Sequence, residues 1–495
     1  MFERITPETA GISSDKIVKF IDRIEKRGAI MHSILMMRHG KIFNENYWAP
    51  FNKDFCHRMY SQTKSYAAIG IGLLEEEGKL SLDDKVCDIF PDKIDGEISV
   101  HLKEQTIRQM LTMTTVGNPA NWFYDTKNPD RTHIYFNERT EAHPAGTIWE
   151  YDSAGSQVLC AIVERLSGMP MLDYLKSKLF NKMGTFQTAN ILKTRNNDSW
   201  GDSALLCTTR DMASCAQLLM DGGVWEGERL INEKFVKDAT SKQVDNSSKW
   251  FNACFIHGYG YQIWRTEQNG FAFVGMGDEI TIALPDRGLI FVCTADHQGT
   301  DNLIRNIMVN AFFDIIVDNL SDKPLPEDKD ALERLTNRTS DLKLRSMQGM
   351  EDSPFRKELN GKVYECEENP MGITKFHFTF SDDGKTGELH YTNAQGDKVL
   401  PFGVNHNVFG KFPQLGYSND HGGLRTTDGF MYDDAVSFAW LEDKKLIVFA
   451  QIIDRYFGLM SGVFAFRDNY AAAQFAKVGE DFLQEYNGNM WATAK

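Results

Sequence analysis

The sequence has no apolar run of about 18 residues, the minimum length typical of a membrane-spanning helix. It also has no Cys-x-x-Cys pair, no His-x-x-x-His pair, no Gly-x-Ser-x-Gly elbow and no phosphate-binding glycine loop. Basic residues do not balance acidic ones: 54 Lys and Arg face 69 Asp and Glu, which gives a formal net charge of −15. Nucleic acids and anionic membranes bind clustered Lys and Arg. We therefore expect a protein without a metal site, an organic cofactor, or a nucleic-acid or membrane partner.

The eight cysteines are scattered without metal-ligand spacing, and most have apolar neighbours, as in Leu206-Cys207. This pattern is typical of small core residues that stay reduced in a cytosol. The N-terminal segment contains acidic residues and a proline where a signal peptide would have a basic segment and then an apolar one. The sequence therefore predicts a cytoplasmic protein.

At 495 residues, with 42% hydrophobic and 25% charged residues, the composition is that of a soluble globular protein with more than one domain. The charged, proline-containing stretch at residues 322–330 indicates a domain boundary. We predict a first domain over residues 1–320, a linker over residues 321–355 and a β-rich domain over residues 356–495.

Two apolar runs between residues 33 and 47, joined by His39-Gly40-Lys41, predict a β-hairpin. Residues 100–245 are mainly helical by periodicity. Four strands are expected at residues 260–264, 270–274, 279–284 and 288–293, followed by a helix over residues 301–317. Strands at both ends of a helical segment predict an α+β fold, with an antiparallel sheet assembled around a helical insertion.

Beyond the linker, alternating runs such as residues 374–380 and 445–450 predict a separate antiparallel β domain. Its aromatic residues are more typical of a core than of a ligand platform. This domain could bind a partner, cover the mouth of a site or bury sheet surface of the first domain, and our hypothesis is that it restricts substrate size. The sequence does not predict the oligomeric state.

Ser61 and Lys64, in the segment Ser61-Gln62-Thr63-Lys64, lie at the start of a nearly continuous apolar run. One turn apart on a helix, the amine can take the proton of the hydroxyl, so the serine is a nucleophile with its own base. The N-terminus of a buried helix also offers unpaired N–H groups that stabilise an anion on an attacked carbonyl. The same spacing recurs at Ser13-Lys16 and Ser340-Lys343, but these polar stretches are typical of helix caps.

Two further segments accompany this motif. Residues 149–155 read Trp-Glu-Tyr-Asp-Ser-Ala-Gly and precede an apolar helical run, and residues 205–213 read Leu-Leu-Cys-Thr-Thr-Arg-Asp-Met-Ala. With these segments, residues 5–318 resemble the penicillin-recognising serine hydrolases, the superfamily of class C β-lactamases, DD-peptidases, D-amino-acid-specific peptidases and family VIII esterases. The resemblance implies a β-lactamase-like fold and an acyl-enzyme mechanism.

By this resemblance, Tyr151 is the partner of Lys64 in proton transfer, and a nearby cationic Lys favours the phenolate form of a Tyr. Taken alone, a Tyr in an aromatic-rich loop is more often a packing residue. Ser153 stands where the family often has Asn. It either hydrogen-bonds Lys64 or the substrate, or it caps a helix.

The third family motif is a Lys or His, a Thr, Ser or Gly, and then a Gly, on the strand beside the site, where a backbone N–H completes the oxyanion hole. The matching stretch here is Gly275-Met276-Gly277-Asp278-Glu279. An apolar Met276 speaks against binding the carboxylate of a penicillin. Asp278 replaces the last Gly and adds negative charge near the developing oxyanion. The alignment makes the N–H groups of Ser61 and Glu279 the two oxyanion donors.

The preferred hypothesis is an active serine hydrolase that cleaves a small ester, amide or D-peptide through an acyl-enzyme on Ser61, with Lys64 and Tyr151 as general base and acid. A catalytically silent binding or sensor protein is the alternative, motivated by Met276 and Asp278. A true β-lactamase is a minor alternative, because that activity protects a cell from a periplasmic or secreted location and the sequence shows no export signal.

Trp122 and Tyr124 lie in a loop between the first and second motifs, where loops of this family border the pocket. Their aromatic rings are candidates for substrate contact, and a packed loop is an equal alternative.

Overall fold

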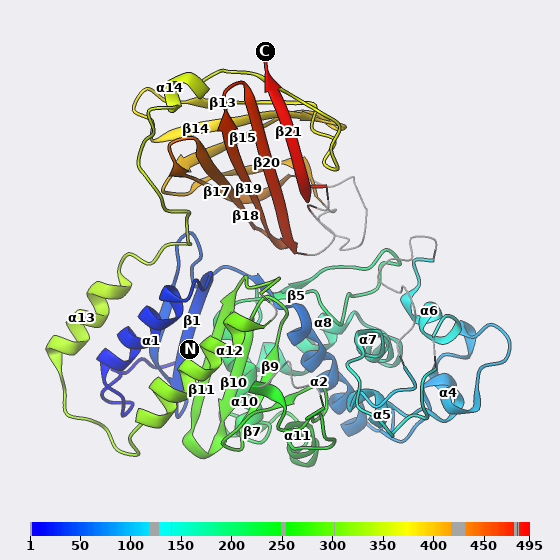
Figure 1. The fold of residues 1–495 in the computed structure, drawn as a ribbon. Helices are drawn as coiled ribbons and strands as arrows, with labels where there is room; N and C mark the ends of the chain where they lie inside the picture. Colours follow the sequence, from blue (N-terminus) through cyan, green and yellow to red (C-terminus); the bar gives the residue numbers. More distant parts are fainter. Residues whose placement is uncertain are drawn as a thin grey trace. The chain divides into compact units, whose positions relative to one another are not determined.

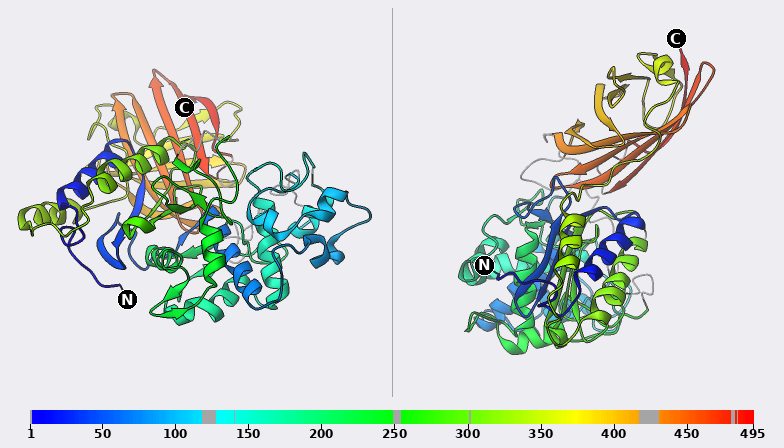
Figure 2. Two further views of the ribbon diagram at one scale, coloured as in Figure 1. Left: turned by 90° about the horizontal axis from the view of Figure 1, so that it is seen from below. Right: turned by 90° about the vertical axis from the view of Figure 1, so that its left-hand side faces the viewer.

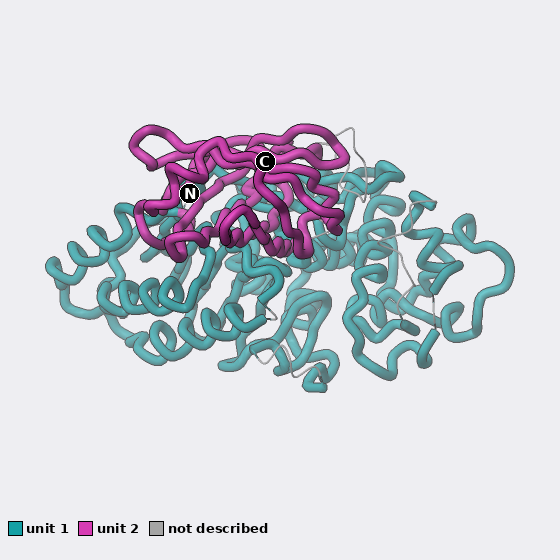
Figure 3. The backbone as a smooth tube through the Cα atoms, turned by 45° about the horizontal axis from the view of Figure 1, so that its top comes forward, with its two compact units in different colours: residues 1–343, 420–424 teal, residues 344–419, 425–495 magenta. Residues whose placement is uncertain are grey.

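A computed structural model of the chain describes two compact units, which divide between Lys343 and Leu344 (Figure 3). The described residues are 2–117, 128–139, 141–248, 254–300, 302–416, 431–479, 483 and 485–495. Within these ranges, no helix is both long enough and apolar enough to cross a membrane. All eight cysteines are free thiols.

Six antiparallel strands form the main sheet of the first unit, in the order β2-β1-β11-β10-β9-β8 (Figure 1). Their bounds are β1 (Met31–Arg38), β2 (Lys41–Tyr47), β8 (Trp264–Arg265), β9 (Phe271–Val274), β10 (Ile280–Leu284) and β11 (Leu289–Ala295). The turn between β1 and β2 has positive φ at His39 (48°) and Gly40 (74°), as a two-residue hairpin turn of type I′ requires. The predicted sheet, assembled from both ends of the segment, is therefore confirmed.

Alternate side chains of this sheet enter two different apolar cores. On β1, Ile34 and Met36 belong to the core that includes the buried faces of α1 and α12. Leu35 and Met37 belong to the core that includes α2, α7 and α10. Both views of Figure 2 show α1 and α13 side by side on one side of the sheet. Burial on both faces explains why the strands are almost wholly apolar instead of alternating with polar residues.

The helical insertion lies between β2 and β8, and three short strands within it, β3, β4 and β5, form a small second sheet. The helices of the first unit are α1 (Ser14–Lys26), α2 (Thr63–Glu76), α3 (Val86–Ile89), α4 (Val100–Glu104), α5 (Ile107–Leu111), α6 (Arg131–Asn137), α7 (Ser153–Ser167), α8 (Met171–Leu175), α9 (Asn181–Met183), α10 (Thr209–Met220), α11 (Glu233–Thr240), α12 (Leu303–Ala311) and α13 (Lys329–Thr339). The remaining strands are β3 (His57–Arg58), β4 (Asn190–Ile191), β5 (Leu205–Cys207), β6 (Val224–Trp225) and β7 (Glu228–Arg229).

Two element boundaries differ from the sequence prediction. The strand expected at residues 260–264 is reduced to Trp264–Arg265, because Gln262 has a positive φ of 57°, which an extended strand does not allow. The predicted linker contains α13, which packs against α1. Ser13 accepts a hydrogen bond from the Asp15 N–H and is the N-cap of α1, which confirms the helix-cap interpretation of that Ser-x-x-Lys copy.

The second unit is an antiparallel β structure whose ends meet. Its elements are α14 (Arg356–Leu359), β12 (Tyr364–Cys366), β13 (Lys375–Phe380), β14 (Thr386–Asn393), β15 (Gly396–Val404), β16 (Val408–Leu415), β17 (Met431–Glu442), β18 (Lys445–Ile453), β19 (Phe457–Arg467), β20 (Tyr470–Gly479) and β21 (Gly488–Ala494). The strand order is β15-β14-β13-β12-β21-β20-β19-β18-β17-β16, and β15 also pairs with β17. This extra pairing closes the sheet into a barrel, which removes most of its free edges.

Aromatic side chains fill the barrel core. Phe378 packs edge-on against Phe464 with ring centroids 5.1 Å apart, and Phe402 stacks on Phe438 at 4.6 Å. Trp440 is completely buried beside them. The prediction that these aromatic residues form a core is confirmed.

Asp434 on β17 gives this barrel a testable dependence on pH. The residue is 2% exposed, and one carboxylate oxygen accepts no hydrogen bond from the described residues. Burial raises the pKa of Asp434 to about 7. A raised acid pKa means that stability is full below the unfolded-state pKa of about 4 and is lost as pH rises through about 7. The loss is at most about 4 kcal/mol.

We expect Asp434→Asn to gain stability relative to the wild type as pH rises from about 4 to about 8, because the amide cannot ionise. Thermal unfolding of both proteins across this range measures the difference. Asp433→Asn is the matched control, since Asp433 is exposed and paired with Lys411 at 2.7 Å. Parallel pH profiles for Asp434→Asn and the wild type would contradict the prediction.

Candidate active site

Ser61 lies in a short 3₁₀ turn, Tyr60–Gln62, that leads directly into α2. Tyr60 has a positive φ of 46°, so the chain bends sharply immediately before the serine. Met59, which precedes Tyr60, is fixed by a hydrogen bond from its N–H to the Leu205 carbonyl, 2.8 Å long. Ser61 is half-buried, whereas residues 63–74 of α2 are buried on every side. A rigid, buried helix therefore supports the turn that carries the partly accessible Ser61 hydroxyl.

The Lys64 amine lies against the Ser61 hydroxyl. Its Nζ donates to Ser61 Oγ at 2.9 Å and to the Asp202 carbonyl at 2.7 Å. Lys64 is 2% exposed, so bulk water does not compete for these hydrogen bonds. The spacing of the two residues along the helix and the second hydrogen bond fix the amine where it can exchange a proton with the serine.

Asp202 is a site residue that the sequence analysis missed. Its carboxylate lies 3.8 Å from Lys64 Nζ and 3.9 Å from an Arg131 guanidinium nitrogen. Neither carboxylate oxygen accepts a hydrogen bond from the described residues. Burial raises the pKa of Asp202, while the charges of Lys64, Arg131 and Arg58 act in the opposite direction. No fixed spacing links Asp202 to the Ser-x-x-Lys motif, since it lies 138 residues beyond Lys64.

The loop that presents Asp202 is held by Trp200. Its ring contacts two guanidinium groups, with the Arg58 Cζ 4.7 Å and the Arg131 Cζ 4.6 Å from the ring centroid. Arg58 Nε also donates to the Ser203 carbonyl at 3.0 Å. These cation–π contacts and the hydrogen bond restrict the loop on both sides of Asp202.

Tyr151 lies beside Lys64, as the family resemblance implies. Lys64 Nζ is 5.2 Å from the centroid of the Tyr151 ring, and the ring stacks on Trp264 with centroids 5.8 Å apart. Trp264 belongs to β8, so the short edge strand of the main sheet positions this tyrosine. The structure brings Ser61, Lys64 and Tyr151 together from two helices and a loop.

Ser153 does not cap a helix, and its hydrogen bond to Lys64 or the substrate stays a prediction. It is the first residue of α7, but the N-cap is Asp152, whose side chain accepts from the Gly155 N–H at 2.8 Å. The interpretation of Ser153 as a helix cap is therefore wrong by one residue. Asp152 also accepts from Thr115 Oγ1 and from Arg139, both at 2.6 Å. This network anchors the start of α7, next to Tyr151.

The third motif forms the turn between β9 and β10. Asp278 does not face the site: it is 2% exposed, and Arg305 and His297 pair with its carboxylate at 2.6 Å and 2.7 Å. The expectation of free negative charge near the oxyanion is therefore wrong, because the Arg305 guanidinium neutralises this carboxylate. Glu279 is completely buried, so its N–H does not face a space that a substrate could enter. The assignment of Glu279 as an oxyanion donor is also wrong.

Met276 is the exposed residue of this turn, at 43%. The neighbouring Gly277 N–H is already engaged, since it donates to Glu279 Oε2 at 3.2 Å. Among the described residues, no acceptor binds the N–H of Ser61 or of Met276. These two donors are free at the two segments that approach each other beside the site.

Gly275 permits this approach. A Cβ atom at this position would lie inside van der Waals contact with the Glu279 carboxylate and 2.6 Å from the Met59 carbonyl oxygen. We therefore expect Gly275→Ala to push the turn away from the chain that precedes Ser61 and to lower kcat by about 10- to 100-fold, by analogy with the loss of an oxyanion donor. Ester hydrolysis by the purified variant measures the effect.

Gly78→Ala is the control for a glycine substitution away from the site: its added Cβ meets no atom within 4 Å, and its only cost is the positive φ of 68°. A Gly275→Ala enzyme with the kcat of the wild type would show that the close approach has no role in turnover.

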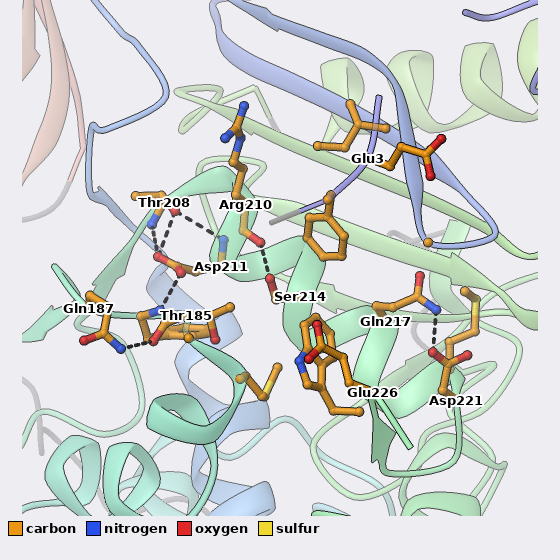
Figure 4. Close-up of a pocket in the computed structure, with 18 of the residues that line it drawn as sticks. Glu3, Thr185, Gln187, Thr208, Arg210, Asp211, Ser214, Gln217, Asp221 and Glu226 are labelled. Carbon is orange, nitrogen blue, oxygen red and sulfur yellow. Dashed lines mark hydrogen bonds between the residues drawn. The ribbon is translucent and has the colours of Figure 1, made fainter. Parts of the chain in front are cut away.

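The segment at residues 205–213 is structural. Thr208 is the N-cap of α10 and forms a capping box with Asp211, whose other carboxylate oxygen accepts from the Phe186 N–H at 2.6 Å (Figure 4). These residues line a cavity of about 840 Å³ that does not include Ser61, Lys64 or Tyr151 in its wall. Reciprocal capping accounts for the Thr-x-x-Asp spacing without a catalytic role.

Trp122 and Tyr124 lie outside the described residues, and their proposed contact with substrate stays a prediction. In the part of the chain that is described, no group of three or more His, Cys, Asp and Glu side chains is arranged to hold a metal ion.

Comparison with known sequences finds a matching protein family and similar proteins. A family model described as beta-lactamase matches residues 19–309. The chain is 25% identical over 280 residues to the 6-aminohexanoate-dimer hydrolase of Paenarthrobacter ureafaciens, which covers 53% of this chain and 71% of that protein. It is 29% identical over 149 residues to penicillin-binding protein 4* of Bacillus subtilis (strain 168), which covers 28% of this chain and 31% of that protein.

Solved structures share the fold at low sequence identity. A putative 6-aminohexanoate-dimer hydrolase from Bacillus anthracis has a TM-score of 0.53 and 16% identity, covering 66% of this chain and 89% of that one. An octameric penicillin-binding protein homologue from Pyrococcus abyssi has a TM-score of 0.50 and 15% identity, covering 96% of this chain and 99% of that one. The second match extends over most of both units.

Proposed function

Because this chain belongs to the beta-lactamase family of serine hydrolases, we propose that it cleaves a small ester or amide through an acyl-enzyme on Ser61. One observation carries the proposal: the buried Lys64 amine lies 2.9 Å from Ser61 Oγ, within reach of the proton that the nucleophile must lose. The centroid of the Tyr151 ring lies 5.2 Å from the same amine.

In the proposed first step, Ser61 Oγ attacks the substrate carbonyl carbon while its proton passes to Lys64. The oxygen of the tetrahedral intermediate becomes negative, and the N–H groups of Ser61 and Met276 stabilise it. The intermediate then collapses, the bond to the alcohol or amine breaks, and Tyr151 with Lys64 returns a proton to that leaving group. An acyl ester on Ser61 and a neutral alcohol or amine result.

In the second step, water attacks the acyl ester. Lys64 and Tyr151 accept the proton of the water, the same two N–H groups stabilise the second oxyanion, and the proton returns to Ser61 Oγ. The products are a carboxylic acid and the free serine, so every proton is accounted for without a cofactor.

Similarity to a 6-aminohexanoate-dimer hydrolase supports a short linear amide as one candidate, with small esters as the other. The exposed, apolar Met276 presents no charged donor for the carboxylate of a penicillin, which disfavours β-lactamase action. The pairing of Asp278 with Arg305 removes one of the two reasons to consider a silent binding protein.

Turnover of p-nitrophenyl esters, D-amino-acid anilides, the 6-aminohexanoate linear dimer and nitrocefin by wild type and Ser61→Ala tests this function. We expect turnover of an ester or amide that falls to the uncatalysed rate in the variant, and a covalent adduct on Ser61 in intact-mass spectra after fluorophosphonate treatment. A folded wild-type protein with neither turnover nor adduct would support the silent binding protein instead.

We also propose that the enzyme works in a reducing compartment such as the cytoplasm. The eight free thiols support this, since most of them are buried core residues.

A further inference from the structure

The turn at residues 275–279 has an unusual backbone that needs an external support. Asp278 adopts a φ of 72°, in the left-handed region that a residue with a Cβ seldom occupies. It is also buried, so its carboxylate has lost hydration and requires a partner. A turn with both features stays in place only when its surroundings fix it.

Arg305, on α12, supplies the largest part of this support. Its Nε donates to Asp278 Oδ1 at 2.6 Å. A second guanidinium nitrogen donates to the Gly275 carbonyl at 2.9 Å and approaches the Met276 carbonyl at 3.4 Å. One side chain thus holds the turn at its beginning, at its tip and near its end. A planar guanidinium can do this because its donors point in several fixed directions.

His297, which follows β11, supplies the rest. Its ring Nδ1 lies 2.7 Å from Asp278 Oδ2, and its backbone N–H donates to the Gly277 carbonyl at 3.1 Å. The Ile30 N–H donates to His297 Nε2 at 2.9 Å, so this nitrogen carries a lone pair and the proton is on Nδ1. The imidazole therefore donates to Asp278.

We propose that Arg305 and His297 are positioning residues that hold the turn so that the Met276 N–H faces the substrate carbonyl as the second oxyanion donor. The assignment rests on the proposed function. Where the family motif ends in Gly, this chain has Asp278. Arg305 and His297 bind its carboxylate, so this residue fixes the turn and adds no unpaired charge near the oxyanion. The turn is attached through Asp278 to the main body of the first unit.

The electrostatics agree with this role. Burial opposes ionisation of Asp278, but the charge of Arg305 and the hydrogen bonds from His297 and Arg305 prevail and hold the pKa of the carboxyl below its ordinary value. The carboxylate and the guanidinium neutralise each other. Little net negative charge therefore remains near the position where the oxyanion develops.

Three variants separate positioning from stability: Arg305→Met, Asp278→Asn and the double variant. Arg305→Met removes the hydrogen bonds to the turn and leaves a buried carboxylate without its cation, so both stability and rate should fall. In the double variant the uncompensated charge is gone, so the unfolding temperature should recover toward the wild type. The hydrogen bonds to the Gly275 and Met276 carbonyls are still absent, so the rate should not recover.

The readouts are the unfolding temperature, kcat and KM for an active ester, and the rate of fluorophosphonate labelling of Ser61. We expect Arg305→Met and the double variant to lose about 10- to 100-fold in kcat and in labelling rate, with KM changed less than about threefold. Arg38→Met is the matched control, since Arg38 is a buried arginine that donates to the Ala10 and Ser321 carbonyls away from the site. It should lower stability without this loss of kcat.

Two results would overturn the assignment: unchanged labelling in Arg305→Met, or a labelling rate that recovers together with stability in the double variant. If Arg305→Met does not fold, Arg305→Lys answers the same question, because lysine keeps the positive charge but lacks the planar set of guanidinium donors. An unchanged kcat in Arg305→Lys would also overturn the assignment. Absence of labelling in the wild type would refute the proposed function itself, and with it this role for the turn.

Discussion

Replacing Lys64 by Met should lower kcat/KM for any substrate of this enzyme by about 10³-fold or more, because the variant has no group that can take the proton of Ser61. Lys64→Arg should be equally inactive. Arginine keeps the positive charge but does not give up its proton at any accessible pH, so it cannot act as a base. Equal loss in both variants would separate base catalysis from simple charge stabilisation. Steady-state ester hydrolysis and the rate of acyl-enzyme formation measure both effects.

Loss of the amine also leaves Asp202 with one cation fewer in a buried position, which lowers the stability of the protein. The double variant Lys64→Met/Asp202→Asn removes that charge and keeps the test interpretable. Lys176→Met serves as control, since Lys176 also donates to a backbone carbonyl, that of Ala189 at 3.0 Å, outside the site. Substantial activity in folded Lys64→Met would rule out Lys64 as the base.

Tyr151→Phe should lower kcat by about 10²- to 10³-fold, with little change in stability. The substitution removes only the hydroxyl. The ring contacts with Lys64 and Trp264 involve the aromatic face and are kept. A large loss therefore identifies the hydroxyl as a proton donor or acceptor in the reaction, and a small loss would mean that the ring serves only to position Lys64.

Tyr259→Phe is the matched control for this variant. Tyr259 packs edge-on against the same Trp264, with ring centroids 5.1 Å apart, and is completely buried. It should keep full kcat. Substrates whose leaving groups differ in pKa refine the test. If Tyr151 protonates the leaving group, Tyr151→Phe should lose more kcat for an alkyl amide than for a p-nitrophenyl ester, because p-nitrophenolate leaves without a proton.

The local parts of this site were predictable because their geometry depends on a few consecutive residues. Ser61 and Lys64 are neighbours on any helix, and the apolar run after them can only be a buried helix or strand. The hairpin at His39-Gly40 and the cap at Ser13 also follow from short-range chemistry. For Tyr151, the family resemblance replaced a physical argument, since its spacing alone favours a packing role.

The third motif shows where such reasoning stops. The sequence places an Asp at position 278 but cannot say which way its carboxylate points, and the expectation that it faces the oxyanion was wrong. Its direction is decided by Arg305 and His297, which come from α12 and from the end of β11. Asp202 was missed for the same reason, because it reaches Lys64 only after the intervening helices have packed.

The sequence by itself determined the secondary structure that carries Ser61 and Lys64 and the family to which the chain belongs, because hydrophobic periodicity and i, i+3 spacing are properties of short segments. Only the tertiary structure decided which distant charges meet: Asp202 with Lys64, and Asp278 with Arg305. It also decided which backbone N–H groups of the site are left without acceptors. The physical reason is that a buried charge or donor must find its partner wherever packing brings one, and that partner has no fixed distance along the chain.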